Sequence, residues 1–164
     1  MRSAAFAPVV DESVRVLLLG SLPGTASLAA GQYYAHPRNA FWRLIGAVVG
    51  DELAALPYPE RLAALLRARI GVWDVVASAV RPGSGDAAIR AAEEADLAAL
   101  AARLPALRAV GFNGATAARI GRRQLAAHGA GLALIDLPSS SPAHAGMPFA
   151  AKLERWRALG AWLG

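Results

Sequence analysis

Four short apolar segments of this 164-residue chain each end in a turn rich in glycine, proline, serine or asparagine. Their length and composition are typical of strands that are buried on both faces, as in a parallel sheet. Stretches with helical spacing separate them, and parallel strands need such crossover connections. The sequence therefore predicts an α/β fold with a doubly wound parallel sheet. The predicted strands are Val14–Leu19, Ile70–Ala77, Leu107–Phe112 and Leu132–Leu137.

The intervening segments carry the periodicity of amphipathic helices. The clearest helix follows Asn39, which sits where an N-cap would sit, and Gly50 can end it. The inward face of the last helix is predicted to hold Phe149, Leu153 and Trp156. The other predicted helices cover residues 60–68, 92–103 and 115–123.

The composition favours one compact domain spanning residues 1–164, with residues 1–12 as a loosely ordered N-terminal segment. Hydrophobic residues make up 55% of the chain and charged residues 18%, which is enough to bury a core. The chain has no cysteine, which excludes disulfides and iron–sulfur clusters. Its three histidines are scattered and form no metal-ligand pattern. The sequence shows no signal peptide and no apolar run of about 18 residues, so we expect a cytoplasmic protein without a membrane partner.

The charge balance suits a polyanionic partner without proving one. Seventeen Lys and Arg residues oppose twelve Asp and Glu residues, which gives a net charge of +5. Lys152 is the sole lysine. A basic surface is typical of nucleic-acid binding. The preference for arginine also follows from a GC-rich genome, so both interpretations stay open.

Parallel α/β sheets bind ligands beyond the carboxyl ends of their strands. In this chain those ends are followed by the segments Gly20–Gly24, Ser78–Asp86, Asn113–Gly114 and Leu137–His144. The first is a strand-to-helix turn of small residues, where backbone N–H groups can approach an anion or a flipped base. The alternative is an ordinary tight turn. No Gly-Lys-Ser/Thr follows, so the turn is not a P-loop.

Two of these loops resemble the signature loops of the uracil-DNA glycosylase superfamily. One is Gly20-Ser-Leu-Pro-Gly-Thr-Ala-Ser27, leading into Tyr33-Tyr-Ala-His-Pro-Arg-Asn-Ala-Phe-Trp42; the other is Leu137-Pro-Ser-Ser-Ser-Pro-Ala-His-Ala145. The segment up to Trp42 is most similar to the hypoxanthine-DNA glycosylase branch. The resemblance implies a three-layer α/β/α sandwich with a four-stranded parallel sheet. It also implies a monofunctional enzyme of base excision repair that flips a deaminated base, above all hypoxanthine, out of double-stranded DNA and hydrolyses its N-glycosidic bond. We expect a monomer that needs no metal or organic cofactor.

The resemblance assigns the catalytic role to Asn39 and a stacking role against the extruded base to Tyr34. Many superfamily members carry Asn or Asp at the position of Leu22, which cannot handle the attacking water. Asn39 would instead position water or hold the leaving base. Its alternative role is the helix cap, and the two roles are compatible. The residues predicted to contact the base are Gly20, Ser21, Leu22, Tyr34, Ser78 and Asn113.

The second loop offers three hydroxyls and several backbone N–H groups, which suit phosphate contacts. Related enzymes have a bulky wedge or a catalytic histidine near it, whereas this loop carries Ala143 and His144, where we would expect asparagine. Asp74, inside an apolar strand, needs partners, so it either orders neighbouring loops or contacts the substrate. The predicted DNA contacts are Pro23, Gly24, Ser27, His36, Arg38, Pro138, Ser139, Ser140, Ser141 and His144.

Three rival functions remain at this stage. Hypoxanthine and uracil both present a carbonyl beside a ring N–H, so one amide can read either. The first rival is therefore a uracil or mismatch-thymine glycosylase. The second is a non-catalytic nucleic-acid-binding module on the same fold. The third, an esterase-like hydrolase, lacks the Gly-x-Ser-x-Gly elbow.

Overall fold

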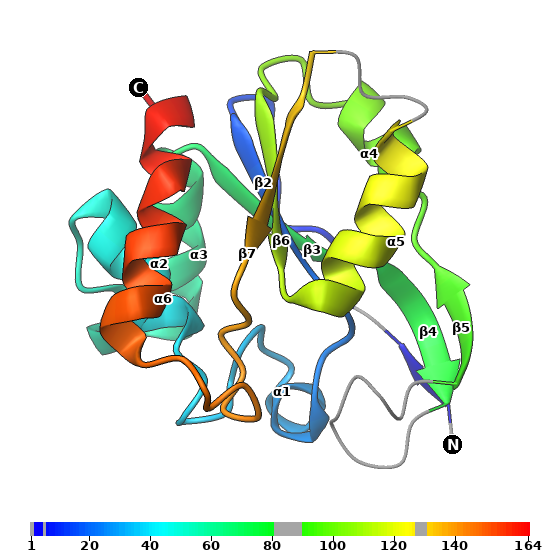
Figure 1. The fold of residues 1–164 in the computed structure, drawn as a ribbon, viewed down its shortest axis with the longest axis horizontal. Helices are drawn as coiled ribbons and strands as arrows, with labels where there is room; N and C mark the ends of the chain where they lie inside the picture. The colour runs from blue at the N-terminus through cyan, green and yellow to red at the C-terminus, as the bar shows by residue number, and fades with distance from the viewer. Residues whose placement is uncertain (1, 5, 81–89, 127–130) are drawn as a thin grey trace.

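A computed structural model describes residues 2–4, 6–80, 90–126 and 131–164 of the chain. Its central feature is a parallel four-stranded sheet with the strand order β3-β2-β6-β7 (Figure 1). This arrangement confirms the predicted four-stranded parallel sheet. Its strands are β2 (Val16–Gly20), β3 (Ile70–Asp74), β6 (Ala109–Asn113) and β7 (Ala133–Leu137).

Helices cover both faces of this sheet and make the three layers (Figure 1). One layer holds α2 (Phe41–Val49), α3 (Tyr58–Arg67), α6 (Phe149–Trp156) and the 3-10 helix η3 (Arg157–Trp162); the other holds α4 (Leu97–Ala102) and α5 (Ala115–Ala126). Each face has its own apolar core. Along β2, Val16 and Leu18 belong to the core under α2, whereas Leu17 and Leu19 belong to the core under α5. Burial of both faces explains why this strand reads as a continuous apolar run.

The predicted strand Ile70–Ala77 is two strands, because β3 ends at Asp74. Val75 donates its N–H to the carbonyl of Gly20 at 2.8 Å, and Val76 donates to Ser21 at 3.0 Å. Beyond Asp74 the chain therefore follows the loop after β2 and leaves the parallel ladder. It continues as β4 (Val76–Val80), the central strand of a three-stranded antiparallel sheet with β1 (Arg2–Ala4) and β5 (Arg90–Glu94). The sequence prediction missed this sheet, because an apolar run reports burial and not the path of the chain.

The helix predicted over residues 92–103 begins only at Leu97. Asp96 caps it, since its carboxylate accepts the N–H of Ala99 at 3.0 Å. The preceding residues Arg90–Glu94 form β5, which pairs with β4. Alanine and glutamate favour a helix by intrinsic propensity, but pairing with a neighbouring strand overrides that preference here.

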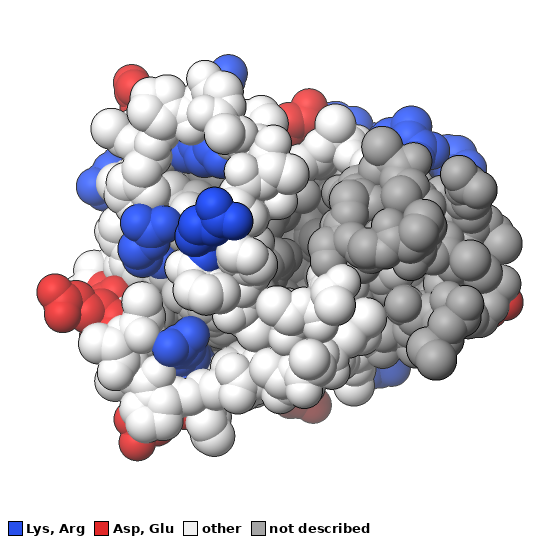
Figure 2. Space-filling view, turned by 90° about the horizontal axis from the view of Figure 1, so that it is seen from below, with Lys and Arg blue, Asp and Glu red and all other residues white. Residues whose placement is uncertain are grey.

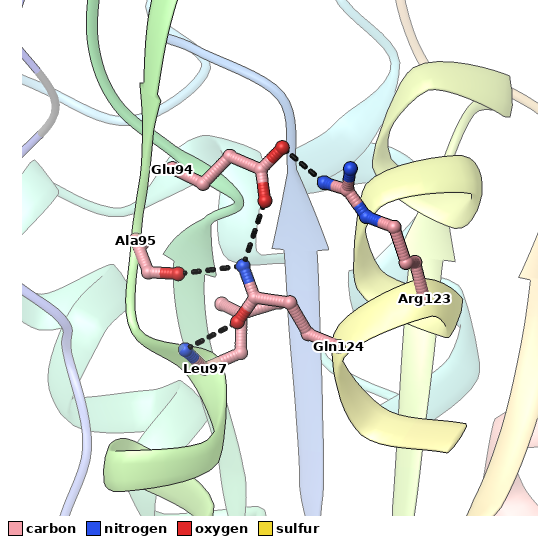
Figure 3. Close-up of polar contacts among 5 residues, drawn as sticks. All are labelled: Glu94, Ala95, Leu97, Arg123 and Gln124. Carbon is pink, nitrogen blue, oxygen red and sulfur yellow. Dashed lines mark hydrogen bonds and ion pairs between the residues drawn. The ribbon is translucent and has the colours of Figure 1, made fainter. Parts of the chain in front are cut away.

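Side chains of α5 hold the connection between β5 and α4 (Figure 3). The Gln124 amide accepts the N–H of Leu97 at 3.1 Å and donates to the carbonyl of Ala95 at 2.9 Å. Glu94 accepts a second hydrogen bond from Gln124 and an ion pair from Arg123. The exposed end of the antiparallel sheet is thereby tied to the layer that covers the parallel sheet.

Parts of the N-terminal segment pair with neighbouring strands. Residues 2–4 form β1, and Val9 exchanges two backbone hydrogen bonds with Val72, at 2.9 and 3.0 Å. In the segment Ser78–Asp86, which was expected to border the ligand site, residues 81–86 lie outside the described residues. Among the helices in the described ranges, none has the length and apolar character needed to cross a membrane.

Candidate active site

A cavity of about 510 Å³ opens at the carboxyl ends of the parallel strands. Its position is the one that the strand topology predicts, and its volume lies within the usual range for small-ligand sites. The wall after β2 comprises residues 20–27 and residues 33, 34, 36 and 39. The first of these stretches ends inside the short helix α1 (Thr25–Ala30). The rest of the lining is Asp74, Asn113, Ser139, Ser140, Ser141, Pro142, Ala143 and His144.

Gly20, the last residue of β2, leaves room for two polar groups. A side-chain carbon at this position would lie 2.7 Å from Oδ1 of Asp74 and 2.7 Å from the Tyr34 hydroxyl. Asp74 is the β3 partner of Gly20 in the ladder and is only 3% exposed. The absent side chain at Gly20 therefore lets a buried carboxylate and a phenol approach the cavity floor together.

The two adjacent tyrosines have different surroundings. Tyr33 is buried, and its hydroxyl donates to the carbonyl of Ala7 at 3.0 Å. Burial, followed by the negative charge of Asp74, raises the pKa of Tyr33, which keeps the phenol neutral. Tyr33, Phe41 and Trp42 are core residues.

Tyr34 has the geometry of a stacking platform. Its ring lies parallel to the ring of Phe41, with centroids 3.9 Å apart and an interplanar angle of 13°. Its backbone adopts φ = 54°, a left-handed conformation that is unfavourable for a residue with a bulky side chain. Such strain persists only where surrounding contacts fix it, and it occurs often at ligand sites. One ring face is covered by Phe41, so only the other face is available to a ligand.

The Asn39 amide is oriented by the start of α2. Its Oδ1 accepts the N–H of Phe41 at 3.0 Å, so Asn39 does cap the helix, although the cap position itself is Ala40. Because a backbone N–H can only donate, the atom that faces Phe41 must be the oxygen. The amide keeps its two N–H donors for other partners. Asn39 thus lines the cavity, and the N-cap position expected for it belongs to Ala40, the residue after it.

His36 and Arg38 shape the turn before Asn39. The His36 Nδ1 accepts the N–H of Arg38 at 3.1 Å, and the His36 carbonyl accepts the N–H of Asn39 at 2.9 Å. A neutral His36 therefore carries its hydrogen on Nε2. His36 lines the cavity, whereas Arg38 is exposed outside the lining.

Asn113 and Ser140 tie the ends of β6 and β7 together. The Asn113 Oδ1 accepts the N–H of Ser140 at 2.8 Å, and its Nδ2 donates to the Ser140 hydroxyl at 2.9 Å. The Ser140 carbonyl in turn accepts the N–H of Ala40 at 2.9 Å. Both side chains are buried, so their visible role is to join the loop after β7 to the start of α2.

Serine side chains fold the loop after β7 into successive tight turns. The Ser139 hydroxyl accepts the N–H of Ser141 at 3.1 Å, and the Ser141 hydroxyl accepts the N–H of Ala143 at 3.1 Å. These are local side-chain-to-backbone turns, and each hydroxyl keeps its own hydrogen for donation. Ser139 and Ser141 therefore shape the loop and can still bind an acceptor such as a phosphate oxygen.

Two of the predicted contact residues besides Arg38 lie outside the cavity lining. Ser78 is in β4, paired with Ala4 and Glu93 in the antiparallel sheet, because the strand that contains it leaves the parallel sheet. Pro138 precedes the lining segment, and its carbonyl accepts the indole N–H of Trp156 at 3.0 Å. All other predicted site residues lie together around the cavity.

The surface around the cavity carries positive charge on one side. Figure 2 shows the face at the carboxyl ends of the strands, with Lys and Arg side chains gathered over the side that holds α2 and α6. On this side of the fold, the guanidinium of Arg43 in α2 lies 5.2 Å from the ring centre of Phe149, the first residue of α6. Phe149 is 38% exposed, contrary to its predicted inward position.

Sequence reasoning missed Lys152, which is 5% exposed and takes the inward place on α6. Its ammonium donates to the carbonyl of His144 at 2.7 Å, at the end of the cavity loop. The available signal was a lone lysine four residues before Trp156, within an otherwise apolar helix face. The sequence allows either a structural or a substrate-binding role for Asp74, and its side chain belongs to a residue of the cavity lining.

This arrangement defines a class: an α/β protein with a cavity, lined by polar groups and an aromatic ring, at the carboxyl edge of a parallel sheet. The sequence model of the Uracil DNA glycosylase superfamily matches residues 7–160. The chain belongs to this superfamily, and it is a DNA glycosylase, a hydrolase of N-glycosidic bonds in DNA.

Two curated relatives and one solved structure are similar over most of the chain. A hypoxanthine DNA glycosylase of Methanosarcina barkeri is 44% identical over 114 residues, which cover 70% of this chain and 72% of the relative. A hypoxanthine DNA glycosylase of Methanosarcina acetivorans is 40% identical over 144 residues, which cover 88% of this chain and 89% of the relative. The solution structure of a candidate uracil DNA glycosylase from Methanosarcina acetivorans superimposes with a TM-score of 0.87 at 36% identity, covering 99% of each chain.

Proposed function

We propose that this DNA glycosylase excises hypoxanthine from deoxyinosine in duplex DNA by base flipping and leaves an abasic site. A base inside a duplex must leave the stack before its glycosidic bond can be attacked. The cavity supplies a receiving site, with the Tyr34 ring as a stacking surface and polar groups beside it. The names of the two Methanosarcina relatives support hypoxanthine as the base.

The observation that carries this proposal is that one cavity contains both a hydrogen-bond donor, Asn39, and a hydrogen-bond acceptor, Asp74. Asn39 offers N–H donors, since its oxygen is bonded to Phe41. Asp74 lines the same cavity and, when ionised, offers only acceptors. Deaminated bases present a carbonyl acceptor beside a ring N–H donor, whereas adenine and cytosine present an amino donor beside a ring lone pair. A fixed donor and a fixed acceptor are complementary to the first pattern and mismatched to the second.

The same orientation of Asn39 suggests its part in the chemistry. Cleavage of the C1′–N bond develops positive charge on the sugar and negative charge on the leaving base. A carboxamide is too weak a base to take a proton from water at neutral pH. Its N–H donors stabilise negative charge on the base, and a preorganised donor of this kind is worth roughly 10²-fold or more in rate. Asn39 therefore holds the leaving base, and water completes the hydrolysis at C1′.

The position of Lys152, the single lysine of the chain, leads us to expect base release without strand cleavage. A bifunctional glycosylase attacks C1′ with an amine, which forms a Schiff base with the opened sugar. Lys152 does not line the cavity, and its ammonium is bonded to the His144 carbonyl. This placement gives Lys152 no route to C1′ and supports a monofunctional enzyme.

Base release from four duplexes tests the proposal, each assayed with and without excess chelator. The duplexes carry inosine, uracil, xanthine or a G·T mismatch. We expect release of hypoxanthine, with and without chelator, and intact strands until the abasic site is cleaved by alkali. Release of uracil or thymine without hypoxanthine would select the second candidate, a uracil or mismatch-thymine glycosylase. Tight binding to duplex DNA without release of any base would point to a non-catalytic module.

A uracil-acting enzyme is the second candidate for a structural reason. Uracil presents the same carbonyl and ring N–H pattern to a donor–acceptor pair, and the name of the similar solution structure refers to uracil. The cavity of about 510 Å³ is roomy enough for a purine, so it does not exclude the smaller ring by size. Weaker stacking of a pyrimidine on Tyr34 is our reason for ranking it second.

A further inference from the structure

The buried lysine of α6 bonds to the loop that forms one wall of the cavity. Lys152 is 5% exposed, and its ammonium donates to the backbone carbonyl of His144 at 2.7 Å. Burial lowers the pKa of Lys152. A buried ammonium is unfavourable unless it is hydrogen-bonded, and the His144 carbonyl supplies that bond. Lysine carries a compact ammonium on a flexible four-carbon stem, whereas arginine carries a larger planar guanidinium, so the two are not equivalent at a buried carbonyl.

The same helix also holds the other end of this loop. Trp156 follows Lys152 by four residues, so both side chains project from one face of α6. The Trp156 indole donates to the carbonyl of Pro138 at 3.0 Å. Two side chains one helical turn apart thus hold both ends of the segment 138–144, which we call the grip loop. Its middle is held separately by the bonds of Ser140.

The two anchors differ in what else they support. The Trp156 ring packs edge-on against Phe41, with centroids 5.8 Å apart, and Phe41 lies behind Tyr34. Trp156 therefore supports both walls of the cavity. The hydrogen bond of Lys152 reaches the grip loop alone, at the end that carries His144, an exposed residue that also lines the cavity.

We propose that Lys152 is a positioning residue for DNA binding: it fixes the His144 end of the grip loop, so that the His144 side chain stands at the cavity mouth and contacts the duplex. This inference rests on the proposed function and deepens it. Ala143 and His144 occupy the loop tip, and Ala143 is too small to fill the space that a flipped base leaves. His144 is the larger group at that tip, and its backbone is the one that Lys152 holds.

The test compares Lys152→Met with the wild-type enzyme. Methionine keeps most of the apolar stem and removes both the donor and the charge. We expect affinity for undamaged and inosine-containing duplexes to fall by about 10-fold or more, the size of a hydrogen bond to a charged group. The single-turnover rate at saturating enzyme should stay within about 3-fold, because the groups of the other wall are untouched. A lower saturating rate with unchanged affinity would overturn the proposal.

Arg155→Met is the matched control, since Arg155 is an exposed cation on the same helix. It removes the same charge, and we expect an affinity change below about 3-fold. Equal losses for the two variants would show that Lys152 acts only through net charge. A double-mutant cycle with His144→Ala supplies the second readout: if Lys152 acts through His144, the double variant binds about as weakly as the weaker single variant. Independent, additive losses contradict that route.

Two further measurements keep the outcome clear. If Lys152→Met does not fold, Lys152→Arg retains charge and donor but not the fit, and it should weaken binding in the same way; wild-type affinity for that variant would overturn the proposal. Affinity for undamaged duplex does not depend on catalysis. Wild-type protein that binds DNA but releases no base would refute the proposed function and leave the role of Lys152 readable from the affinities.

Discussion

The two walls of the cavity are held in place by different means. The start of the wall between β2 and α2 is held by Val75 and Val76, which donate to the carbonyls of Gly20 and Ser21. The part of this wall around Asn39 also has bonds to its own neighbouring backbone. Asn39 bonds to Phe41, His36 bonds to Arg38, and the Ser27 hydroxyl accepts the N–H of Ala35 at 3.0 Å. The wall after β7 has local serine turns as well, but distant side chains on β6 and α6 fix its position: Asn113, Lys152 and Trp156.

This contrast predicts a division of labour. Groups held by local bonds keep their geometry when helices shift slightly, and catalysis depends on such fixed geometry. A loop held from a separate helix follows the packing of that helix, which a contact with the deformable duplex can tolerate. Changes in the first wall should therefore lower excision rates and base discrimination. Changes in the second wall should lower affinity for duplex DNA of any sequence.

The largest effect is expected for Asn39→Ala. We predict a fall in single-turnover excision of at least about 10²-fold, because a preorganised donor to the leaving base is lost. Affinity for undamaged duplex should change little, since the grip loop is intact. Rapid-quench assays with excess enzyme measure the first quantity and fluorescence anisotropy the second.

Asn39→Asp is the control that separates the donor from the cap. Aspartate keeps an oxygen for the N–H of Phe41 but, when ionised, offers no N–H. We expect it to fold as well as the wild type and to be as slow as Asn39→Ala. An active Asn39→Asp enzyme would mean that the residue handles water, as acidic residues do in related enzymes, and does not hold the base.

The next effect concerns Asp74 and the ring N–H of the base. Asp74→Asn should lower excision of hypoxanthine by about 10- to 100-fold, the size of a hydrogen bond to a charged group. It should raise excision from a duplex that carries nebularine, because that purine has a lone pair where hypoxanthine has N–H and the new amide can donate to it. Single-turnover rates on both duplexes measure the change in preference.

A purely structural Asp74 gives a different pattern. Loss of loop order would slow both substrates together and leave their ratio unchanged. Gly20→Ala supplies that reference, since its new methyl group would displace the Asp74 carboxylate and the Tyr34 hydroxyl at once. If Asp74→Asn behaves like Gly20→Ala on both duplexes, the base-reading role of Asp74 is wrong.

Tyr34→Ala should have a smaller effect on the same wall. Base–aromatic stacking is worth ~1–3 kcal/mol. We expect the lower end for this loss, because the Phe41 ring lies directly behind Tyr34 and becomes available. The quantity to measure is the affinity for a duplex with an uncleavable inosine analogue relative to an undamaged duplex. Tyr34→Phe keeps the ring and should keep this ratio; equal weakening of both duplexes by Tyr34→Ala would place Tyr34 on the DNA backbone instead.

The sequence predicted the first wall better than the second. The four parallel strands and the turn at Gly20 follow local patterns and are present in the structure, whereas the N-cap of α2 is Ala40 and not the expected Asn39. The antiparallel sheet was missed because a continuous apolar run does not show where the chain leaves a ladder, as it does after Asp74. The helix predicted over 92–103 begins too early, because residues 92–94 belong to β5, whose pairing with β4 depends on contacts distant in sequence.

The second wall depends on just such distant contacts. Asn113 was expected to read a base edge, but its amide is bonded to Ser140, which lies 27 residues away. Lys152 received no role, because hydrophobic periodicity assigns a lysine to the exposed face and Phe149 to the buried one. The structure reverses both assignments. The sequence therefore identifies the residues of this loop as site residues. The side chains that hold the loop in place are recognised only from the tertiary structure.

The smallest effects are expected for the serines of the grip loop. Ser139→Ala and Ser141→Ala each remove a hydroxyl that shapes the loop and can donate to a phosphate. We expect each to weaken binding by about 2- to 10-fold, the net value of one hydrogen bond, and to affect undamaged and analogue duplexes alike. The salt dependence of binding should not change, because serine carries no charge and releases no counterion from DNA. Ser13→Ala, on an exposed turn outside the cavity lining, is the matched control and should bind normally. Loss of affinity for the analogue duplex alone would move these serines to the flipped nucleotide and would remove the distinction between the two walls.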